Sequence, residues 1–126
     1  MRLLQRADFE RVYKTGRRFG SPLFTAFLVR RPDNELGSRV GFTTPRGLGK
    51  SVTRNRIRRR LREVVRLLWT ELAPGWDLVF NPRRALLDAP ASGIETEVRR
   101  LFGNIAAASS SNQETAGEVS AREQKP

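Results

Sequence analysis

Residues 51–72, SVTRNRIRRRLREVVRLLWTEL, decide the fold that this sequence predicts. Their apolar side chains recur at helical spacing, so they fall on one stripe of a helix. The stripe consists of Ile57, Leu61, Val64, Val65, Leu68 and Leu72. Ser51 or Thr53 can cap the start of this helix, and Pro74-Gly75 stops it after about Leu72. We expect the apolar stripe to pack against a sheet.

The other side of the same helix is almost entirely basic. It carries Asn55, Arg56, Arg58, Arg59, Arg60, Arg62 and Arg66, with Glu63 as its only acid. An ordinary amphipathic surface helix mixes Glu with Lys to gain ion pairs, whereas like charges on one face repel each other unless a partner neutralises them. This face therefore predicts a polyanionic partner.

The distribution of charge along the chain supports the same prediction. Lys and Arg number 24 against 13 Asp and Glu, a net charge of +11, and residues 46–66 alone carry nine basic residues and one acid. Nucleic acid binds such a concentration of charge with release of counterions. Arginine also pairs with phosphate in a bidentate way and stacks on exposed bases, which favours folded RNA over double-stranded DNA.

The residues before the long helix predict a short helix and two strands. Ala7–Lys14 is typical of a helix that Asp8 can cap, with Phe9, Val12 and Tyr13 on one face. Phe24–Arg30 and Arg39–Thr44 are typical of strands. A turn at Pro32-Asp33-Asn34 lies between these strands, and a hairpin is the simplest way to join them.

The residues after the long helix predict a third strand and a last helix. Trp76–Phe80 has the composition of a strand, and Ser92 can cap a helix with apolar residues at helical spacing. The predicted fold is one small α/β domain over residues 1–105, an α+β two-layer sandwich of order αββαβα, or αβββαβα with one further strand. Residues 106–126 lose apolar periodicity and are predicted to form a disordered tail.

Composition excludes several kinds of enzyme. The chain has no Cys and no His, so it offers no cysteine nucleophile, no thiolate metal site and no imidazole base. A carboxylate-dependent metallonuclease is poorly supported, because Asp8, Glu10, Asp33 and Glu35 form no recognisable ligand spacing. We therefore predict no catalytic or metal-binding side chain. No apolar stretch suits a membrane span or a signal peptide, so we expect a cytoplasmic protein.

Three motifs, in order, resemble the bacterial ribonuclease P protein family. Arg54-Asn55-Arg56, within GKSVTRNRIRRRLRE, is similar to the arginine-asparagine-arginine signature of that family. DFERVYKTGRR, residues 8–18, looks like the family's first helix and turn, and GWDLV, residues 75–79, looks like its strand after the long helix. The resemblance covers roughly Arg2 to Ile105, and it implies an α/β fold with a left-handed βαβ crossover, against the usual right-handed rule.

The resemblance also implies a function and its partners. In that family a catalytic RNA holds the Mg²⁺ ions and hydrolyses the bond between the 5′ leader and the tRNA, while the protein binds the RNA and the leader. The protein alone is then expected to be inactive, with no organic cofactor and no obligate protein partner. Carried over, the residues that contact the catalytic RNA are Arg54, Asn55, Arg56, Arg58, Arg59 and Arg62.

The leader of the precursor tRNA is expected to bind along an aromatic cleft. Phe9, Tyr13 and Phe27 correspond to the family's cleft positions, and Arg46 and Lys50 are expected to add leader contacts. Pro45-Arg46-Gly47 replaces the family's usual Ser-Lys-Lys, which implies weaker contacts there. Arg60 occupies a position where an apolar residue is common and is expected to add charge to the RNA-facing side.

Two alternatives stay open at this stage. The three rings can be ordinary core, and a small ribosomal-type RNA-binding protein with a structural role would bury them, whereas a leader cleft needs accessible rings. Five other large aromatic residues are expected to be structural: Phe24, Phe42, Phe80, Trp69 and Trp76.

Overall fold

The computed structural model describes residues 1–32 and 37–123, with side chains described as far as Ser109. Its helices and strands follow in the predicted order αβββαβα, with a first strand that the sequence left open. They are α1 (Phe9–Thr15), β1 (Arg17–Gly20), β2 (Phe24–Arg30), β3 (Arg39–Phe42), α2 (Ser51–Leu67), β4 (Trp76–Pro82) and α3 (Ala91–Glu123). Short 3₁₀ turns lie between them: η1 (Arg6–Asp8), η2 (Arg46–Leu48), η3 (Trp69–Glu71) and η4 (Arg84–Leu87).

The four strands form one sheet in the order β1-β2-β4-β3. β4 pairs antiparallel with β2 and parallel with β3, so β3, α2 and β4 form the predicted βαβ unit, whose handedness stays a prediction. The predicted hairpin between β2 and β3 is wrong, because β4 lies between them. Trp76 to Phe80 are all buried, and a strand buried along its length takes a central position in the sheet. Asp33 and Asn34 of the predicted turn lie outside the described residues.

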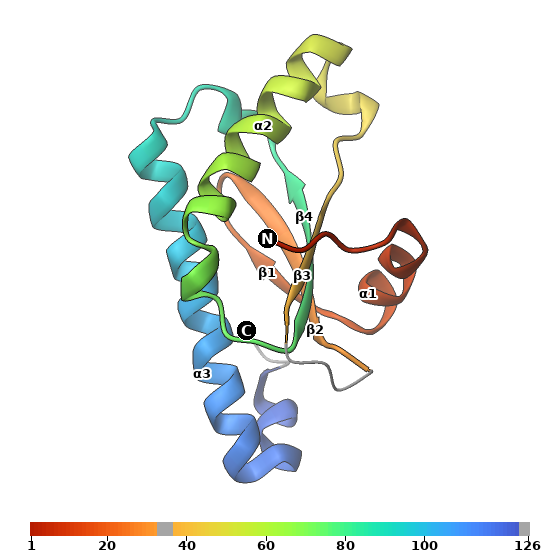
Figure 1. Ribbon diagram of the computed structural model, residues 1–126, viewed down its shortest axis with the longest axis vertical. Coiled ribbons are helices and arrows are strands. Elements are labelled where there is room, and N and C mark those ends of the chain that lie inside the picture. The colour runs from red at the N-terminus through yellow and green to blue at the C-terminus, as the bar shows by residue number, and fades with distance from the viewer. Residues whose placement is uncertain (33–36, 124–126) are drawn as a thin grey trace.

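Helices cover both faces of this sheet (Figure 1). Phe24, Ala26 and Leu28 of β2 alternate inward toward the main core, which α2 and α3 close. On the opposite face, Val79 packs with Val12 of α1 in a second, smaller core. The predicted two-layer sandwich is present, and α1 adds a short third layer over part of the free face. This arrangement leaves an edge of that face open beside α1.

The apolar stripe of α2 is buried as predicted, but the ends of the helix differ from the prediction. Ile57, Leu61 and Val65 are fully buried, whereas Leu72 is half-buried and lies beyond η3. The residue before α2 is Lys50, which gives no side-chain cap, and Ser51 is already in the first turn. The helix ends at Leu67, where the chain tightens into η3.

Two further capping predictions are wrong. Asp8 precedes α1 without capping it, because it is the last residue of η1 and its backbone is already helical, with φ −88° and ψ −9°. A capping residue takes an extended backbone, from which its side chain reaches the free N–H groups of the first turn. Ser92 does not cap α3 either, since α3 begins at Ala91.

The segment predicted to be a disordered tail, residues 106–126, begins within α3, which continues past residue 105 to Glu123. Its disorder stays a prediction, and residues 124–126 lie outside the described part of the chain. The prediction of disorder was based on the loss of apolar periodicity. Ala, Glu and Gln have high helix propensity, so a helix can continue there without an apolar face. Its first part beyond residue 105 still contacts the domain, because Trp76 Nε1 donates a hydrogen bond of 2.7 Å to Ser109 Oγ.

A buried carboxylate fixes α1 to the sheet. Asp77 on β4 is fully buried, and it accepts hydrogen bonds from two arginines. Arg39 of β3 donates from Nε and Nη2 at 2.9 and 2.8 Å, and Arg11 of α1 donates from Nη2 at 2.6 Å. A buried carboxylate requires such paired donors. These bonds hold α1 at the position that shapes the adjoining open edge.

Candidate nucleic-acid interface

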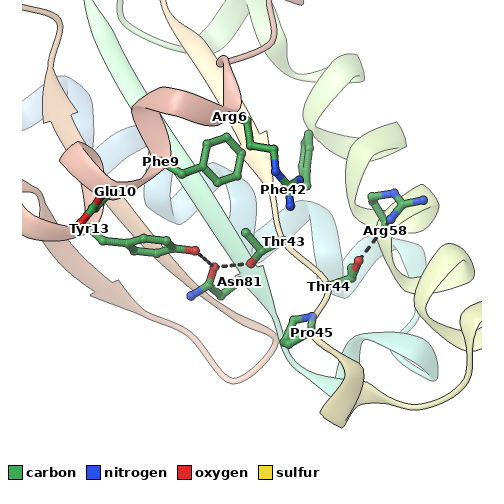
Figure 2. A pocket seen from close by; sticks show the side chains of 10 residues that line it. All are labelled: Arg6, Phe9, Glu10, Tyr13, Phe42, Thr43, Thr44, Pro45, Arg58 and Asn81. Carbon is green, nitrogen blue, oxygen red and sulfur yellow. Dashed lines mark hydrogen bonds between the residues drawn. The ribbon is translucent and has the colours of Figure 1, made fainter.

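A groove with a volume of about 800 Å³ lies between α1 and the ends of β3 and β4 (Figure 2). Its wall combines aromatic, hydroxyl, amide and basic groups from four parts of the chain. The lining residues are Arg6, Phe9, Glu10, Tyr13, Phe42, Thr43, Thr44, Pro45, Arg58 and Asn81. Two of the three predicted cleft aromatics are among them. The part of the sheet that α1 leaves open therefore carries a groove lined by aromatic, polar and basic side chains, which we take as the candidate site.

The outer end of the Phe9 ring reaches the sheet because β3 carries a glycine at this point. A Cβ atom at Gly41 would lie 2.4 Å from Cζ of Phe9, closer than atoms of this kind approach. Phe9 is half-buried and packs against the smaller core, so one side of its ring supports α1. Its remaining surface lines the groove.

Tyr13 is the most accessible of the three predicted rings, with 37% of its surface exposed. Its ring stands edge-on against Phe27, with 5.0 Å between ring centroids and an interplanar angle of 81°. Its hydroxyl donates to Asn81 Oδ1 at 2.9 Å. Phe27 is half-buried and is not among the residues that line the groove. The structure thus places Tyr13 at the surface and Phe27 behind it as support.

Phe42 was predicted to be structural, and the structure shows it packed against the core while it also reaches the groove. Its ring stacks on Phe80 of the main core, at 5.6 Å and 11°, and it also lines the groove. Phe42 is half-buried because β3 is an edge strand, so its ring contacts the core while its outer side stays open. Strand order decides this exposure, and the sequence prediction had placed β3 beside β2.

The predicted RNA-binding residues lie together on α2. Asn55, Arg56, Arg59 and Arg62 are exposed, and Arg58 is half-buried. Arg58 Nη1 donates to Thr44 Oγ1 at 3.1 Å, and Nη2 donates to Asn55 Oδ1. We call the surface formed by Asn55, Arg56, Arg58, Arg59 and Arg62 the arginine face.

The groove and the arginine face are continuous. Arg58 lines the groove, and it also lines a shallow hollow with Asn55, Arg59 and Arg62. Its guanidinium is held at this junction by its bond to Thr44. A nucleic acid bound in the groove would therefore lie beside one bound on the arginine face.

Two arginines of α2 are held by the protein's own carbonyl groups. Arg54 Nη1 donates to the carbonyl of Thr44 at 3.3 Å, and its Nε is buried without a partner. Arg60 donates from its guanidinium to three carbonyl oxygens beside η4, those of Leu86, Leu87 and Ala89, at 2.7 to 2.9 Å. The prediction that Arg60 adds charge to the RNA-facing side is therefore wrong, because its guanidinium fixes the β4–α3 connection to α2.

Arg46 and Lys50, predicted to bind the leader, lie at the start of α2. Both are exposed, Arg46 on η2 and Lys50 directly before the helix. Neither lines the groove, whose wall ends at Pro45. They are therefore placed between the end of the groove and the first turn of the arginine face.

The acidic residues near this surface leave its charge largely uncompensated. Glu63 pairs with Arg66 at 3.0 Å and Glu10 pairs with Lys14 at 3.4 Å, both exposed. Among the side chains that the structure describes, no three His, Cys, Asp or Glu residues gather closely enough to hold a metal ion. No helix within the described residues is long and apolar enough to cross a membrane.

The protein is a small α/β domain in which an aromatic groove adjoins a face of arginines. These features are typical of single-domain RNA-binding proteins. Comparison with known proteins identifies the family. The Ribonuclease P family model matches residues 1–106, and the chain belongs to this family. Its members are the protein components of ribonuclease P, a tRNA-processing ribonucleoprotein endoribonuclease.

Individual relatives agree with this assignment. The ribonuclease P protein component of Chloroflexus aggregans is 46% identical over 102 residues, covering 80% of this chain and 74% of the relative. That of Symbiobacterium thermophilum is 40% identical over 101 residues, covering 80% and 87%. Among solved structures, the RNase P protein from Thermotoga maritima has a TM-score of 0.73 at 26% identity, covering 83% of this chain and 97% of that one. The family resemblance is confirmed, and the ribosomal-type alternative is set aside.

Proposed function

We propose that this chain, as the protein subunit of ribonuclease P, binds the catalytic RNA through the arginine face and the single-stranded 5′ leader of precursor tRNA in the groove. It thereby assists removal of the leader to give the mature 5′ end of the tRNA. The observation that carries the proposal is the continuity of the two surfaces at Arg58.

The groove has the chemistry that an unpaired strand requires. Phe9, Tyr13 and Phe42 offer ring surfaces on which bases of any sequence can stack. Arg6 and Arg58 lie at the groove and can neutralise the strand's phosphates. A duplex keeps its base faces stacked on one another, whereas an unpaired strand can place them on the rings, so the proposed ligand is a single strand, which the leader supplies.

The proposal gives the bond-breaking chemistry to the RNA. The chain has no His or Cys, and the described acidic groups provide no Mg²⁺ site. We therefore place the Mg²⁺ ions mainly on the catalytic RNA, where the arginine face would supply part of the charge that folded RNA otherwise takes from Mg²⁺. With these partners, we propose that the protein acts in the cytoplasm.

Replacing Tyr13 tests the groove directly. In the reconstituted holoenzyme, Tyr13→Ala should cost about 1–3 kcal/mol of affinity for precursor tRNA, because one stacking surface is lost. Binding of mature tRNA, which has no leader, should stay nearly unchanged. Both affinities are measured at one salt concentration, after circular dichroism confirms folding.

The matched control for this prediction is Tyr13→Phe, which keeps the ring and removes only the hydroxyl. It should retain most of the precursor affinity. Equal losses for precursor and mature tRNA in Tyr13→Ala, or no loss for either, would remove Tyr13 from the leader site.

A further inference from the structure

One amide in the groove is held in a defined orientation by two hydroxyl groups. Tyr13 Oη donates to Asn81 Oδ1 at 2.9 Å, and Thr43 Oγ1 donates to the same oxygen at 2.5 Å. The amide oxygen can accept both of these hydrogen bonds, because it carries two lone pairs, so the amide nitrogen lies at the other end of the group. The orientation of this amide is therefore set by its neighbours.

The other end of the amide is available to a ligand. Figure 2 shows Nδ2 of Asn81 pointing away from the two hydroxyls, and Asn81 is one of the residues that line the groove. Nδ2 has no acceptor within the part of the chain that the structure describes. An amide nitrogen carries two N–H donors and no acceptor, so the groove presents a donor group at this point.

We propose that Asn81 determines base specificity in the leader, by donating from Nδ2 to a carbonyl oxygen or ring nitrogen on the edge of an unpaired base. The proposal rests on the function proposed above, because it requires the leader to lie in the groove. The neighbouring rings hold bases by their faces, which all bases share, so stacking alone does not discriminate. A fixed donor reads the base edge, where the four bases differ.

Tyr13 then has two separable roles. Its ring is a stacking surface that Phe27 supports edge-on, and its hydroxyl orients the amide of Asn81. Removing the ring, and the hydroxyl with it, should weaken binding of every leader. Removing only the hydroxyl should leave binding strength largely intact but let the amide rotate, so that discrimination between bases falls.

The experiment measures the affinity of the reconstituted holoenzyme for precursor tRNAs that carry each of the four bases, at each leader position in turn. At one position the wild type should show a spread of about 3- to 10-fold, the worth of a net hydrogen bond. In Asn81→Ala this spread should collapse to within about twofold, with the loss concentrated on the preferred base. Asn81→Asp, which turns the donor into an acceptor of the same shape, should move the preference from the base favoured by the wild type toward bases that present an amino group.

Several outcomes would overturn the proposal: no spread at any position in the wild type, an unchanged spread in Asn81→Ala, or an equal loss for all four bases. Tyr13→Ala separates this failure from that of the proposed function. If Tyr13→Ala lowers affinity only for precursors with a leader while Asn81→Ala leaves the spread unchanged, the groove binds the leader and Asn81 does not read it. If Tyr13→Ala has no leader-dependent effect, the proposed function itself fails.

Discussion

Asp77→Ala should lower the free energy of unfolding by about 3–5 kcal/mol, the cost of removing one partner from a buried ion pair. The carboxylate is fully buried and accepts three hydrogen bonds, which link α1 and β3 to β4. Without it, the guanidinium groups of Arg11 and Arg39 would face each other across the space that the carboxylate fills, with Asp8 at 3.5 Å from Arg11 and 3.8 Å from Arg39. Arg11 is 28% exposed and can turn partly to solvent, which favours the lower end of this range.

Urea denaturation followed by circular dichroism measures this loss. The matched control is Glu63→Ala, which breaks the exposed pair with Arg66 and should cost less than about 1 kcal/mol. A loss for Asp77→Ala no larger than that of the control would contradict the assigned role of this carboxylate. Because the same network positions α1, any folded fraction of Asp77→Ala should also bind the leader more weakly.

The second large effect is expected on the arginine face. Arg56, Arg59 and Arg62 are exposed, and within the described residues they make no hydrogen bond or ion pair. Replacing all three by alanine should leave the protein folded while weakening its binding to the catalytic RNA on the order of 100-fold at about 0.1 M salt. The log-log slope of affinity against salt should also fall by about 2 to 3, at about 0.7–0.9 for each lost phosphate contact.

A salt titration of binding between the protein and the catalytic RNA measures both quantities. The control variant carries Arg99→Ala and Arg100→Ala on α3, where both residues pair with glutamates. If the control and the arginine-face variant lose the same affinity per charge removed, binding depends on net charge alone and the face is not the contact surface. An unchanged slope in the arginine-face variant would also show that α2 faces something other than RNA.

The long helix could be predicted from the local spacing of apolar residues. The order of the strands could not be predicted, because no local pattern in the strands encodes it. Ile57, Leu61 and Val65 fall on one side of any helix built from this sequence, so their burial follows from spacing alone. The partner of β2 depends on residues about 50 positions away, and nothing within Phe24–Arg30 distinguishes β3 from β4. The burial of β4 along most of its length was the available signal, in the run WDLVF.

The candidate site also has one part that could be predicted from the sequence and one part that could not. The arginine face lies on one helix and could be predicted, whereas the groove is assembled where four segments of the chain meet. Thr43 and Asn81 carry no motif, and they become neighbours only because β3 and β4 pair in parallel. Arg60 was predicted to face RNA because it lies in an arginine-rich run. Its actual role depends on carbonyl groups near η4, which are distant in the sequence and could not be predicted from the run.

Reconstitution of cleavage tests the central claim most directly. The purified protein, the ribonuclease P catalytic RNA and precursor tRNA are combined over a range of magnesium concentrations, with each component also omitted in turn. We expect no cleavage by the protein and magnesium without the RNA, and cleavage at lower magnesium when the protein joins the RNA, because basic side chains supply part of the neutralising charge. Cleavage by the protein alone at a comparable rate, or a magnesium requirement of the RNA that the protein does not lower, would contradict the account.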